Sequence, residues 1–281
     1  MVSFHTSKHV ISSALILLIV ITLSGCSAEN QNTLNSGNAP KKKVIMTKNE
    51  DKYWQEAKKE VYRDVADLLT QHQSELARGV KYHKYFGGAP SIKQIAITFD
   101  DGPHPKYTQR ILSILRKYNT KATFFVVGKM AELHPELIQA EIADGHNVGN
   151  HTYNHINLKK TPDINAAIEI KACGEVIESI TGKAPHLFRP PGGDYNRQVG
   201  EAAEALGYTM VLWTDDPGDY ASPGAAVINE RVFSKLSNGG IILIHDGIQQ
   251  TVDDLPGIIK HLKKKGYKIV TIDEMIKSGK K

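Results

Sequence analysis

Short hydrophobic runs alternate with longer amphipathic segments from residue 92 onward. The short runs are bounded by turn residues and fit strands, whereas hydrophobic residues in the longer segments recur every three or four positions, as in helices. The predicted strands are residues 92–99, 122–127, 146–150, 186–189, 208–213, 240–244 and 267–271. The predicted helices are residues 107–118, 135–144, 162–181, 197–206, 225–236 and 253–265.

This alternation predicts a parallel sheet that is either covered on both faces or closed into a barrel. The side chains with candidate chemical roles all stand at or just after the carboxyl end of a predicted strand. They are Asp100, Asp101, His151, His155, Arg189, Asp216, Asp219 and His245. In a closed barrel those ends converge on one face, whereas an open sheet spreads them over its width. We therefore predict an α/β fold, a distorted seven-stranded (β/α) barrel with an N-terminal helical extension.

The first residues predict an export signal. A hydrophobic run over 10–23 is short for a membrane span but has the size of a secretory signal core. It ends in Leu23-Ser24-Gly25-Cys26, which resembles a bacterial lipobox, in which the cysteine is acylated. We expect a lipoprotein signal peptide over 1–26 and a lipid anchor on the outer face of the bacterial cytoplasmic membrane. Ordinary signal cleavage and an uncleaved anchor are the alternatives.

Three segments follow this signal. Residues 27–50 are rich in Asn, Ser, Gly and Lys, as expected of a flexible tether. Residues 51–90 are predicted as an amphipathic helical extension, in which 51–78 form one helix. Its hydrophobic face could dock on the body of the protein or on a partner, and we expect it to dock on the body. The remaining residues, 91–281, form the predicted catalytic domain.

Composition and charge narrow the class of protein. A hydrophobic content of 41% is ordinary for a soluble globular core, and the formal net charge of +5 is only mildly basic. The short lysine runs are not interleaved with aromatic residues, so nucleic acid is not an expected partner. With Cys26 acylated, the second cysteine, Cys173, has no disulfide partner and is expected to be buried. We expect a monomer.

Two acidic residues and two histidines suggest a metal site. Asp100 and Asp101 end the first strand of the body, and His151 and His155 follow the third, four residues apart. Catalytic zinc sites typically have three protein ligands and an open position, which leaves one carboxylate free to act as a base. Alone, an Asp-Asp-Gly turn or a histidine pair on a loop means little. Their joint placement at barrel strand ends favours metal-assisted hydrolysis.

Three further segments carry candidate groups. Arg189 precedes Pro-Pro-Gly-Gly, where the Gly192 amide is free to face an oxyanion, although such a segment also suits a simple loop. Asp216 and Asp219 follow the fifth strand, and they could equally be capping residues. His245 ends a hydrophobic strand; it is either a core histidine or a general acid.

The order of these motifs resembles the NodB-type polysaccharide deacetylases, carbohydrate esterase family 4, over residues 91–276. The resemblance implies an incomplete, distorted barrel that removes N- or O-acetyl groups from sugar polymers with a divalent metal. It also assigns a role to each candidate residue. The implied roles are Asp101, His151 and His155 as metal ligands, Asp100 as base oriented by Arg189, His245 as acid paired with Asp219, Gly192 as oxyanion donor and Leu243 as lining of the acetyl slot.

Two positions depart from that family pattern. The family often has an aromatic residue where Gly192 stands and a tryptophan where Tyr220 stands. We expect the glycine to open the groove, and the tyrosine to keep a flat wall with a polar tip. Both changes bear on substrate preference more than on catalysis.

The expected activity is N-deacetylation of GlcNAc-type glycans, because an anchored surface enzyme meets cell-wall or exported aminosugar polymers. Peptidoglycan, chitooligosaccharide and poly-N-acetylglucosamine are all candidate substrates. An acetylxylan-type O-deacetylase and a non-catalytic glycan-binding lipoprotein are the alternatives. Zinc is the first choice of metal, and Co, Mn, Ni or Fe also suit the predicted ligands.

Overall fold

A computed structural model describes residues 46–160 and 163–280 of the chain. The predicted signal peptide 1–26, with Cys26, and nearly all of the predicted tether lie outside the described residues, so lipid anchoring stays a prediction. Among the helices within the described ranges, none combines the length and hydrophobicity that crossing a membrane requires.

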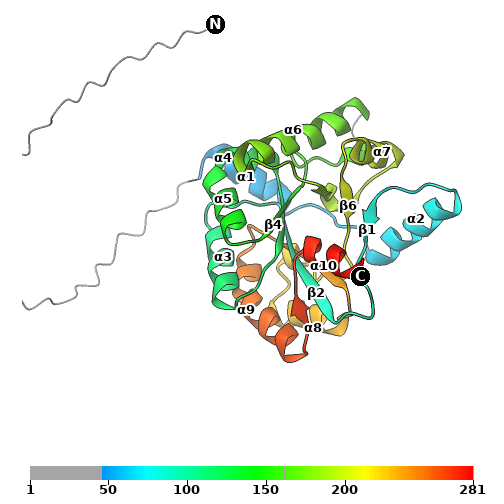
Figure 1. The fold of residues 1–281 in the computed structure, drawn as a ribbon. Coiled ribbons are helices and arrows are strands. Elements are labelled where there is room, and N and C mark those ends of the chain that lie inside the picture. Colours follow the sequence, from blue (N-terminus) through cyan, green and yellow to red (C-terminus); the bar gives the residue numbers. More distant parts are fainter. Residues whose placement is uncertain (1–45, 161–162, 281) are drawn as a thin grey trace, which may run out of the picture. The chain divides into compact units, whose positions relative to one another are not determined.

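Parallel strands form an irregular barrel (Figure 1). Its strands are β2 Gln94–Asp100, β3 Thr123–Val126, β4 Asn147–Asn150, β5 Leu187–Phe188, β6 Thr209–Val211 and β7 Gly240–His245. They are paired in the order β6-β5-β4-β3-β2-β7. A single bridge between Asp215 and Ile242 spans the remaining gap, between β6 and β7. The predicted barrel is therefore confirmed.

Two short strands lie beside this ring. β8, Lys268–Ile269, is the predicted seventh strand, and it pairs with the start of β2 instead of continuing the ring. β1, Lys84–Tyr85, pairs with β6 and was not predicted. It lies within the predicted extension, so part of that extension belongs to the sheet.

Strand alternation determines which side chains face the inside of the barrel. β2 and β7 are neighbours in register, with Asp100 opposite His245. Successive side chains of a strand point to opposite faces. Ile97 packs in the cluster between strands and outer helices, whereas Ala96 and Leu243 belong to the other core cluster. Asp100 shares the parity of Ala96, and His245 that of Leu243, so both reactive groups face inward.

Helices cover the outside of the barrel (Figure 1). They are α3 Thr108–Lys117, α4 Gly128–Leu133, α5 Pro135–Ala143, α6 Asp163–Thr181, α7 Arg197–Ala205, α8 Ala225–Ser234 and α9 Gln249–Lys264. α10, Ile272–Gly279, lies instead at the amino-terminal ends of the strands, where the Ile272 N–H donates to the Thr123 hydroxyl and Ser278 bonds to Gln94. The six predicted helices are confirmed to within a few residues, and the short α4 and α10 were not predicted. Cys173 on α6 is buried in the outer cluster and free of any disulfide, as expected.

The N-terminal extension is not one helix. α1, Lys48–Ala57, begins within the predicted tether, and α2 covers Val65–Ala77. Asp64 has an extended backbone, and its side chain accepts a hydrogen bond from the Ala66 N–H at 2.7 Å. Such an N-cap starts a new helix and interrupts any preceding one. The prediction of a single helix over 51–78 was therefore wrong.

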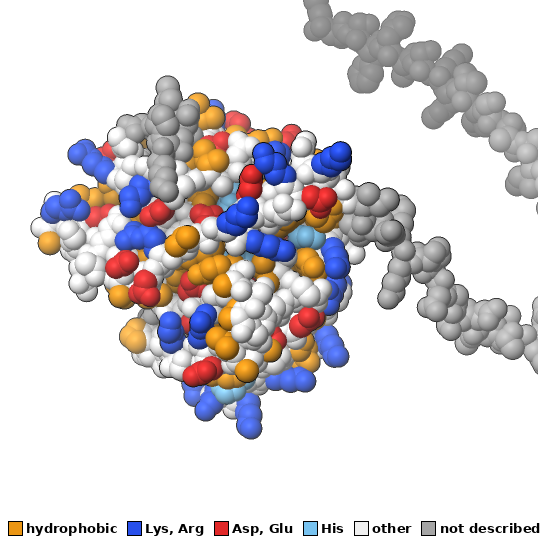
Figure 2. Space-filling model, turned by 180° about the vertical axis from the view of Figure 1, so that it is seen from behind, with side chains coloured by type: hydrophobic (Ala, Val, Ile, Leu, Met, Phe, Trp, Pro, Cys, Tyr) orange, Lys and Arg blue, Asp and Glu red, His pale blue; other side chains and the backbone are white. Residues whose placement is uncertain are grey.

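Both helices dock on the barrel, as predicted. The Trp54 ring of α1 packs against His104, with 4.4 Å between ring centroids, and Leu68 of α2 is fully buried. α1 and α2 lie on opposite sides of the barrel (Figure 1). Figure 2 shows one face of the molecule, on which acidic and basic side chains are interspersed around exposed hydrophobic ones.

Candidate metal centre and active site

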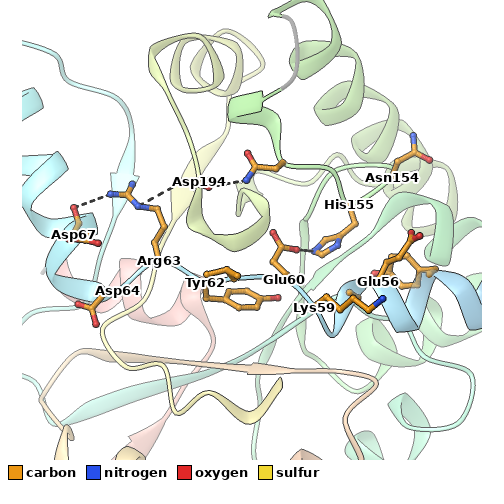
Figure 3. A pocket seen from close by; sticks show the side chains of 14 residues that line it. Glu56, Lys59, Glu60, Tyr62, Arg63, Asp64, Asp67, Asn154, His155 and Asp194 are labelled. Atoms are coloured by element: carbon orange, nitrogen blue, oxygen red, sulfur yellow. Dashed lines mark hydrogen bonds and ion pairs between the residues drawn. The ribbon is translucent and has the colours of Figure 1, made fainter. Parts of the chain in front are cut away.

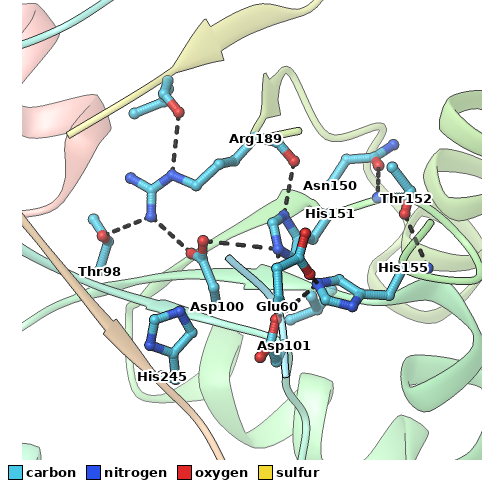
Figure 4. A network of polar contacts seen from close by, with 12 residues as sticks. Glu60, Thr98, Asp100, Asp101, Asn150, His151, Thr152, His155, Arg189 and His245 are labelled. Carbon is cyan, nitrogen blue, oxygen red and sulfur yellow. Dashed lines mark hydrogen bonds and ion pairs between the residues drawn. The ribbon is translucent and has the colours of Figure 1, made fainter. Parts of the chain in front are cut away.

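Asp101, His151 and His155 converge at the carboxyl end of the barrel (Figure 4). Their ligand atoms all lie within 4.8 Å of one another. Asp101 Oδ1 and the Nε2 atoms of both histidines are buried, and Asp101 Oδ1 lies 3.0 Å from His155 Nε2 and 3.6 Å from His151 Nε2. Burial raises the pKa of the Asp101 carboxyl, but the His155 and His151 imidazoles outweigh this and hold it well below its usual range. One carboxylate and two imidazoles that converge in this way fit a divalent ion such as zinc.

A hydrogen bond fixes which nitrogen of His151 faces this centre. His151 Nδ1 lies 2.7 Å from the backbone oxygen of Arg189. A carbonyl oxygen can only accept, so Nδ1 carries the proton and Nε2 keeps its lone pair for a metal. The loop after the Arg189 strand therefore orients a ligand from a neighbouring strand.

The ligand loops have an unusual backbone. Asp101, Thr152 and His155 have φ values of 74°, 68° and 57°, in the left-handed region that side chains other than glycine seldom adopt. Thr152 Oγ1 accepts from the His155 N–H at 3.0 Å, and Asn150 Oδ1 accepts from the Thr152 N–H at 2.9 Å. Strain of this kind persists only where surrounding contacts enforce it, and it concentrates at functional sites.

Asp100 is held by a buried cation. Arg189 Nη1 donates to Asp100 Oδ1 at 2.7 Å and to the Thr98 hydroxyl at 2.8 Å, and Nε donates to the Val211 carbonyl at 3.1 Å. Both members of the ion pair are fully buried. Asp100 Oδ2 has no hydrogen-bond partner and lies 3.7 Å from His151 Nε2. One oxygen of Asp100 is therefore fixed, while the other faces the metal centre.

His245 is paired with Asp219. Nδ1 of the histidine lies 2.6 Å from Asp219 Oδ1, and the His245 N–H donates to Oδ2 at 2.8 Å. The Thr251 hydroxyl donates to the same Oδ2. Burial lowers the pKa of His245, but the Asp219 carboxylate outweighs it and raises the pKa to about 10. The second nitrogen, Nε2, is buried without a partner, so the imidazolium is set to give a proton to whatever group enters the site.

Gly192, Tyr220 and Leu243 also lie at this centre. Gly192 has a φ of 62° in the 3-10 turn Pro191–Gly193, and a Cβ there would lie 2.8 Å from Glu60 Oε1. The Tyr220 ring packs against that of Tyr62, and Leu243 belongs to the same buried cluster as Tyr62. The structure therefore brings these candidate residues together at one end of the barrel, and the roles assigned to them stay predictions. Asp216 instead accepts from the Gly218 N–H at 2.8 Å, in a turn.

Glu60, Tyr62 and Tyr53 were missed by sequence reasoning. Glu60 Oε2 lies 3.0 Å from His155 Nε2, and the Tyr53 hydroxyl donates to the Asp101 carbonyl at 2.8 Å. All three residues stand in the N-terminal extension, where helical periodicity was the dominant pattern. Recognising Asp64 as a helix N-cap was the available signal that residues just before it leave the helix.

Comparisons with known proteins identify the family of this chain. Residues 87–211 match the polysaccharide deacetylase family. A peptidoglycan-N-acetylglucosamine deacetylase of Bacillus cereus is 42% identical over 66% of this chain and 89% of its own length. The peptidoglycan-N-acetylmuramic acid deacetylase PdaC of Bacillus subtilis is 37% identical over 66% of this chain and 39% of its own length.

A solved structure shares the fold. It is the Bc1960 peptidoglycan N-acetylglucosamine deacetylase in complex with 4-naphthalen-1-yl-N-oxidanyl-benzamide. The match has a TM-score of 0.68 and 33% identity, and covers 72% of this chain and 95% of that one. Together with the barrel and the convergent site, these matches confirm the resemblance inferred from the motifs: the chain belongs to the polysaccharide deacetylase family of hydrolases.

Proposed function

We propose that the protein is a metal-dependent deacetylase that hydrolyses N-acetyl groups of GlcNAc-type cell-wall glycans. The observation that carries this proposal is the convergence of Asp101, His151 and His155, whose ligand atoms are buried and lie within 4.8 Å of one another. Two relatives named as peptidoglycan deacetylases support the substrate class. The ligand in the Bc1960 complex is a hydroxamic acid, a metal-chelating group, which supports the metal.

The geometry supports the role proposed for each residue. A divalent ion held by Asp101, His151 and His155 would polarise the acetyl carbonyl and acidify the attacking water. Asp100, oriented by Arg189, takes the proton from that water with its unpaired Oδ2.

The remaining steps use groups on the other side of the centre. The Gly192 amide donates to the developing oxyanion, and Leu243 lines the slot for the acetyl methyl group. His245, kept protonated by Asp219, gives its Nε2 proton to the departing amine. An amine leaves poorly unless it is protonated, so this proton transfer completes the cleavage. Tyr220 offers a flat wall for the sugar.

Three further parts of the proposal rest on sequence and chemistry. Zinc is the proposed metal because two imidazoles and a carboxylate suit it, and Co, Mn, Ni or Fe fit the same ligands. Lipid attachment at Cys26 would hold the protein at the outer face of the cytoplasmic membrane. That location would place the enzyme beside the peptidoglycan, which is why a cell-wall substrate is favoured.

Acetate release tests the proposed function. Metal-loaded protein is expected to release acetate from peptidoglycan or from chitooligosaccharide, and excess chelator should abolish the release until zinc is restored. Release from acetylxylan alone would instead identify an O-deacetylase. If fully metal-loaded protein binds these glycans but releases no acetate from any of them, the chain is a glycan-binding protein and the proposal is wrong.

Replacing Asp219 with asparagine is expected to shift the pH dependence of kcat/KM. The carboxylate that raises the pKa of His245 is lost, whereas burial, which lowers it, remains. His245 then loses its proton at lower pH, so the alkaline decline in rate should begin at least about one pH unit earlier, the equivalent of about 1.4 kcal/mol. Acetate release measured from neutral to strongly alkaline pH checks this. Asp253→Asn, at an exposed site, is the control, and an unmoved alkaline decline in Asp219→Asn would contradict the pairing.

A further inference from the structure

Residues 58–64, here called the strap, cross the active-site end of the barrel between α1 and α2 (Figure 3). The strap presents opposite faces to solvent and to the barrel. Val61 is 83% exposed, whereas its neighbour Tyr62 is only 7% exposed. The Arg63 N–H donates to the Gly192 carbonyl at 3.0 Å, so the strap is bonded directly to the turn that carries the proposed oxyanion donor.

Glu60 places its carboxylate inside the metal centre (Figure 4). Oε2 lies 3.0 Å from His155 Nε2, and Oε1 lies 2.8 Å from the point where a Cβ of Gly192 would stand. The carboxylate therefore occupies the space between a proposed metal ligand and the Gly192 turn. A carboxylate on a methylene has nearly the shape of acetate, and this space is the one that an acetyl group must enter.

Tyr62 covers the general acid in the same way. Its ring centroid lies 4.6 Å from that of His245 and 4.6 Å from that of Tyr220. It also packs edge-on against Trp213, at 6.1 Å. An aromatic ring at this position occupies the place beside His245 that the sugar carrying the departing amine would need.

The strap closes the site to a polymer. Asp100, His151 and His245 are each 0% exposed. A pocket of about 790 Å³ is lined by the strap on one side and by His155 and Asp194 on the other. Among the described residues that line it, His155 is the one proposed metal ligand. The open space therefore lies beside the strap, and a glycan in this pocket does not reach the base or the acid.

Charge favours this closed arrangement when a metal is bound. Glu60 joins Asp100 and Asp101 at the centre, and Arg189 is already paired with Asp100. Buried carboxylates close to one another repel, and a divalent cation turns that repulsion into attraction. A carboxylate oxygen beside His155 is also a suitable ligand for the open position of a catalytic zinc site.

We propose that the strap is an intramolecular pseudosubstrate, in which Glu60 occupies the acetyl position and Tyr62 the adjoining sugar position. This inference rests on the proposed function, because it assigns these positions from the deacetylation mechanism. The strap is anchored at both ends, by buried Trp54 on α1 and buried Leu68 on α2. It can therefore lift from the groove, exposing the site, while both helices stay docked.

Binding of a small chelating acetyl analogue tests the proposal. Acetohydroxamic acid is titrated calorimetrically into the full chain, loaded with zinc and checked by metal analysis, as wild type, Glu60→Ala and Val61→Ala. When a ligand must displace an occupant, its apparent affinity equals its intrinsic affinity multiplied by the fraction of protein in which the site is open. If the strap is closed in nine molecules out of ten, Glu60→Ala should bind about tenfold more tightly than wild type. Val61→Ala removes an exposed strap side chain and should match wild type.

Two further readouts come from the same proteins. Acetohydroxamic acid should accelerate hydrogen exchange of strap amides, including Arg63, in wild type, because the strap is displaced. Glu60→Ala should also release acetate from chitooligosaccharide faster than wild type.

Each contrary result has a distinct meaning. Equal affinity in wild type and Glu60→Ala would overturn the pseudosubstrate while leaving the proposed function intact. Loss of zinc and of acetate release in Glu60→Ala would make Glu60 an obligatory ligand, and would overturn it too. Failure of every zinc-loaded variant to bind the ligand would remove the proposed function, and the pseudosubstrate with it.

Discussion

Replacing Asp100 with asparagine is expected to lower kcat/KM for acetate release by about 10²- to 10⁴-fold while zinc content stays unchanged, the range typical of a lost general base. The asparagine side chain keeps the shape and can still contact Arg189, but its amide cannot take a proton from water. Asp100 Oδ2 is buried, has no hydrogen-bond partner and lies close to His151. A dissolved carboxylate therefore cannot reach this position and act as the base instead. Steady-state acetate assays with metal analysis of the same samples measure both quantities.

Asp101→Asn is the matched control for this prediction. It makes the same carboxylate-to-amide change at the adjacent residue. Because that residue is a proposed metal ligand, loss of its negative charge should lower the affinity for zinc. The two variants therefore separate loss of chemistry from loss of metal. If Asp100→Asn lost the ion and Asp101→Asn kept it, the roles of the two carboxylates would be reversed.

Replacing Arg189 with leucine is expected to reduce the free energy of unfolding by about 3–5 kcal/mol, because removing one partner leaves the other charge buried and unpaired. Arg189 and Asp100 are both fully buried, and the guanidinium also donates to the Thr98 hydroxyl and the Val211 carbonyl. Urea unfolding in excess chelator measures the loss without a contribution from metal release.

The double variant Asp100→Asn/Arg189→Leu is the control. It removes both charges, so it should be more stable than Arg189→Leu alone. Buried partners in direct contact generally deviate from additivity by 0.5–3 kcal/mol. Two results would show that the ion pair contributes little to the fold: additive losses of unfolding free energy in the double variant, or a loss below about 1 kcal/mol in Arg189→Leu.

Much of the barrel could be predicted because its pattern is local. β2 and β7 are hydrophobic runs that end in Asp100 and His245, and strand ends of a parallel barrel must converge. Local pattern does not give register, however. That Asp100 stands opposite His245 depends on the register between two strands that are far apart in sequence.

The strap could not be predicted because its contacts are long-range. Glu60 meets His155 across 95 positions of sequence, and no local pattern encodes such a contact. We expected Gly192 to open the groove. The structure instead places the Glu60 carboxylate in that space, and Tyr220 packs against Tyr62. Both departures from the family pattern therefore lie in contact with the strap.

The lone bridge between Asp215 and Ile242 leaves a seam in the barrel wall. Elsewhere in the ring, neighbouring strands pair directly within the named ladders. At the seam, β1 pairs with the outer edge of β6, so a segment of the N-terminal extension covers the edge that β7 leaves unpaired. Truncation of the chain past β1 would leave this edge of β6 unpaired, so the N-terminal extension is a structural part of the barrel wall.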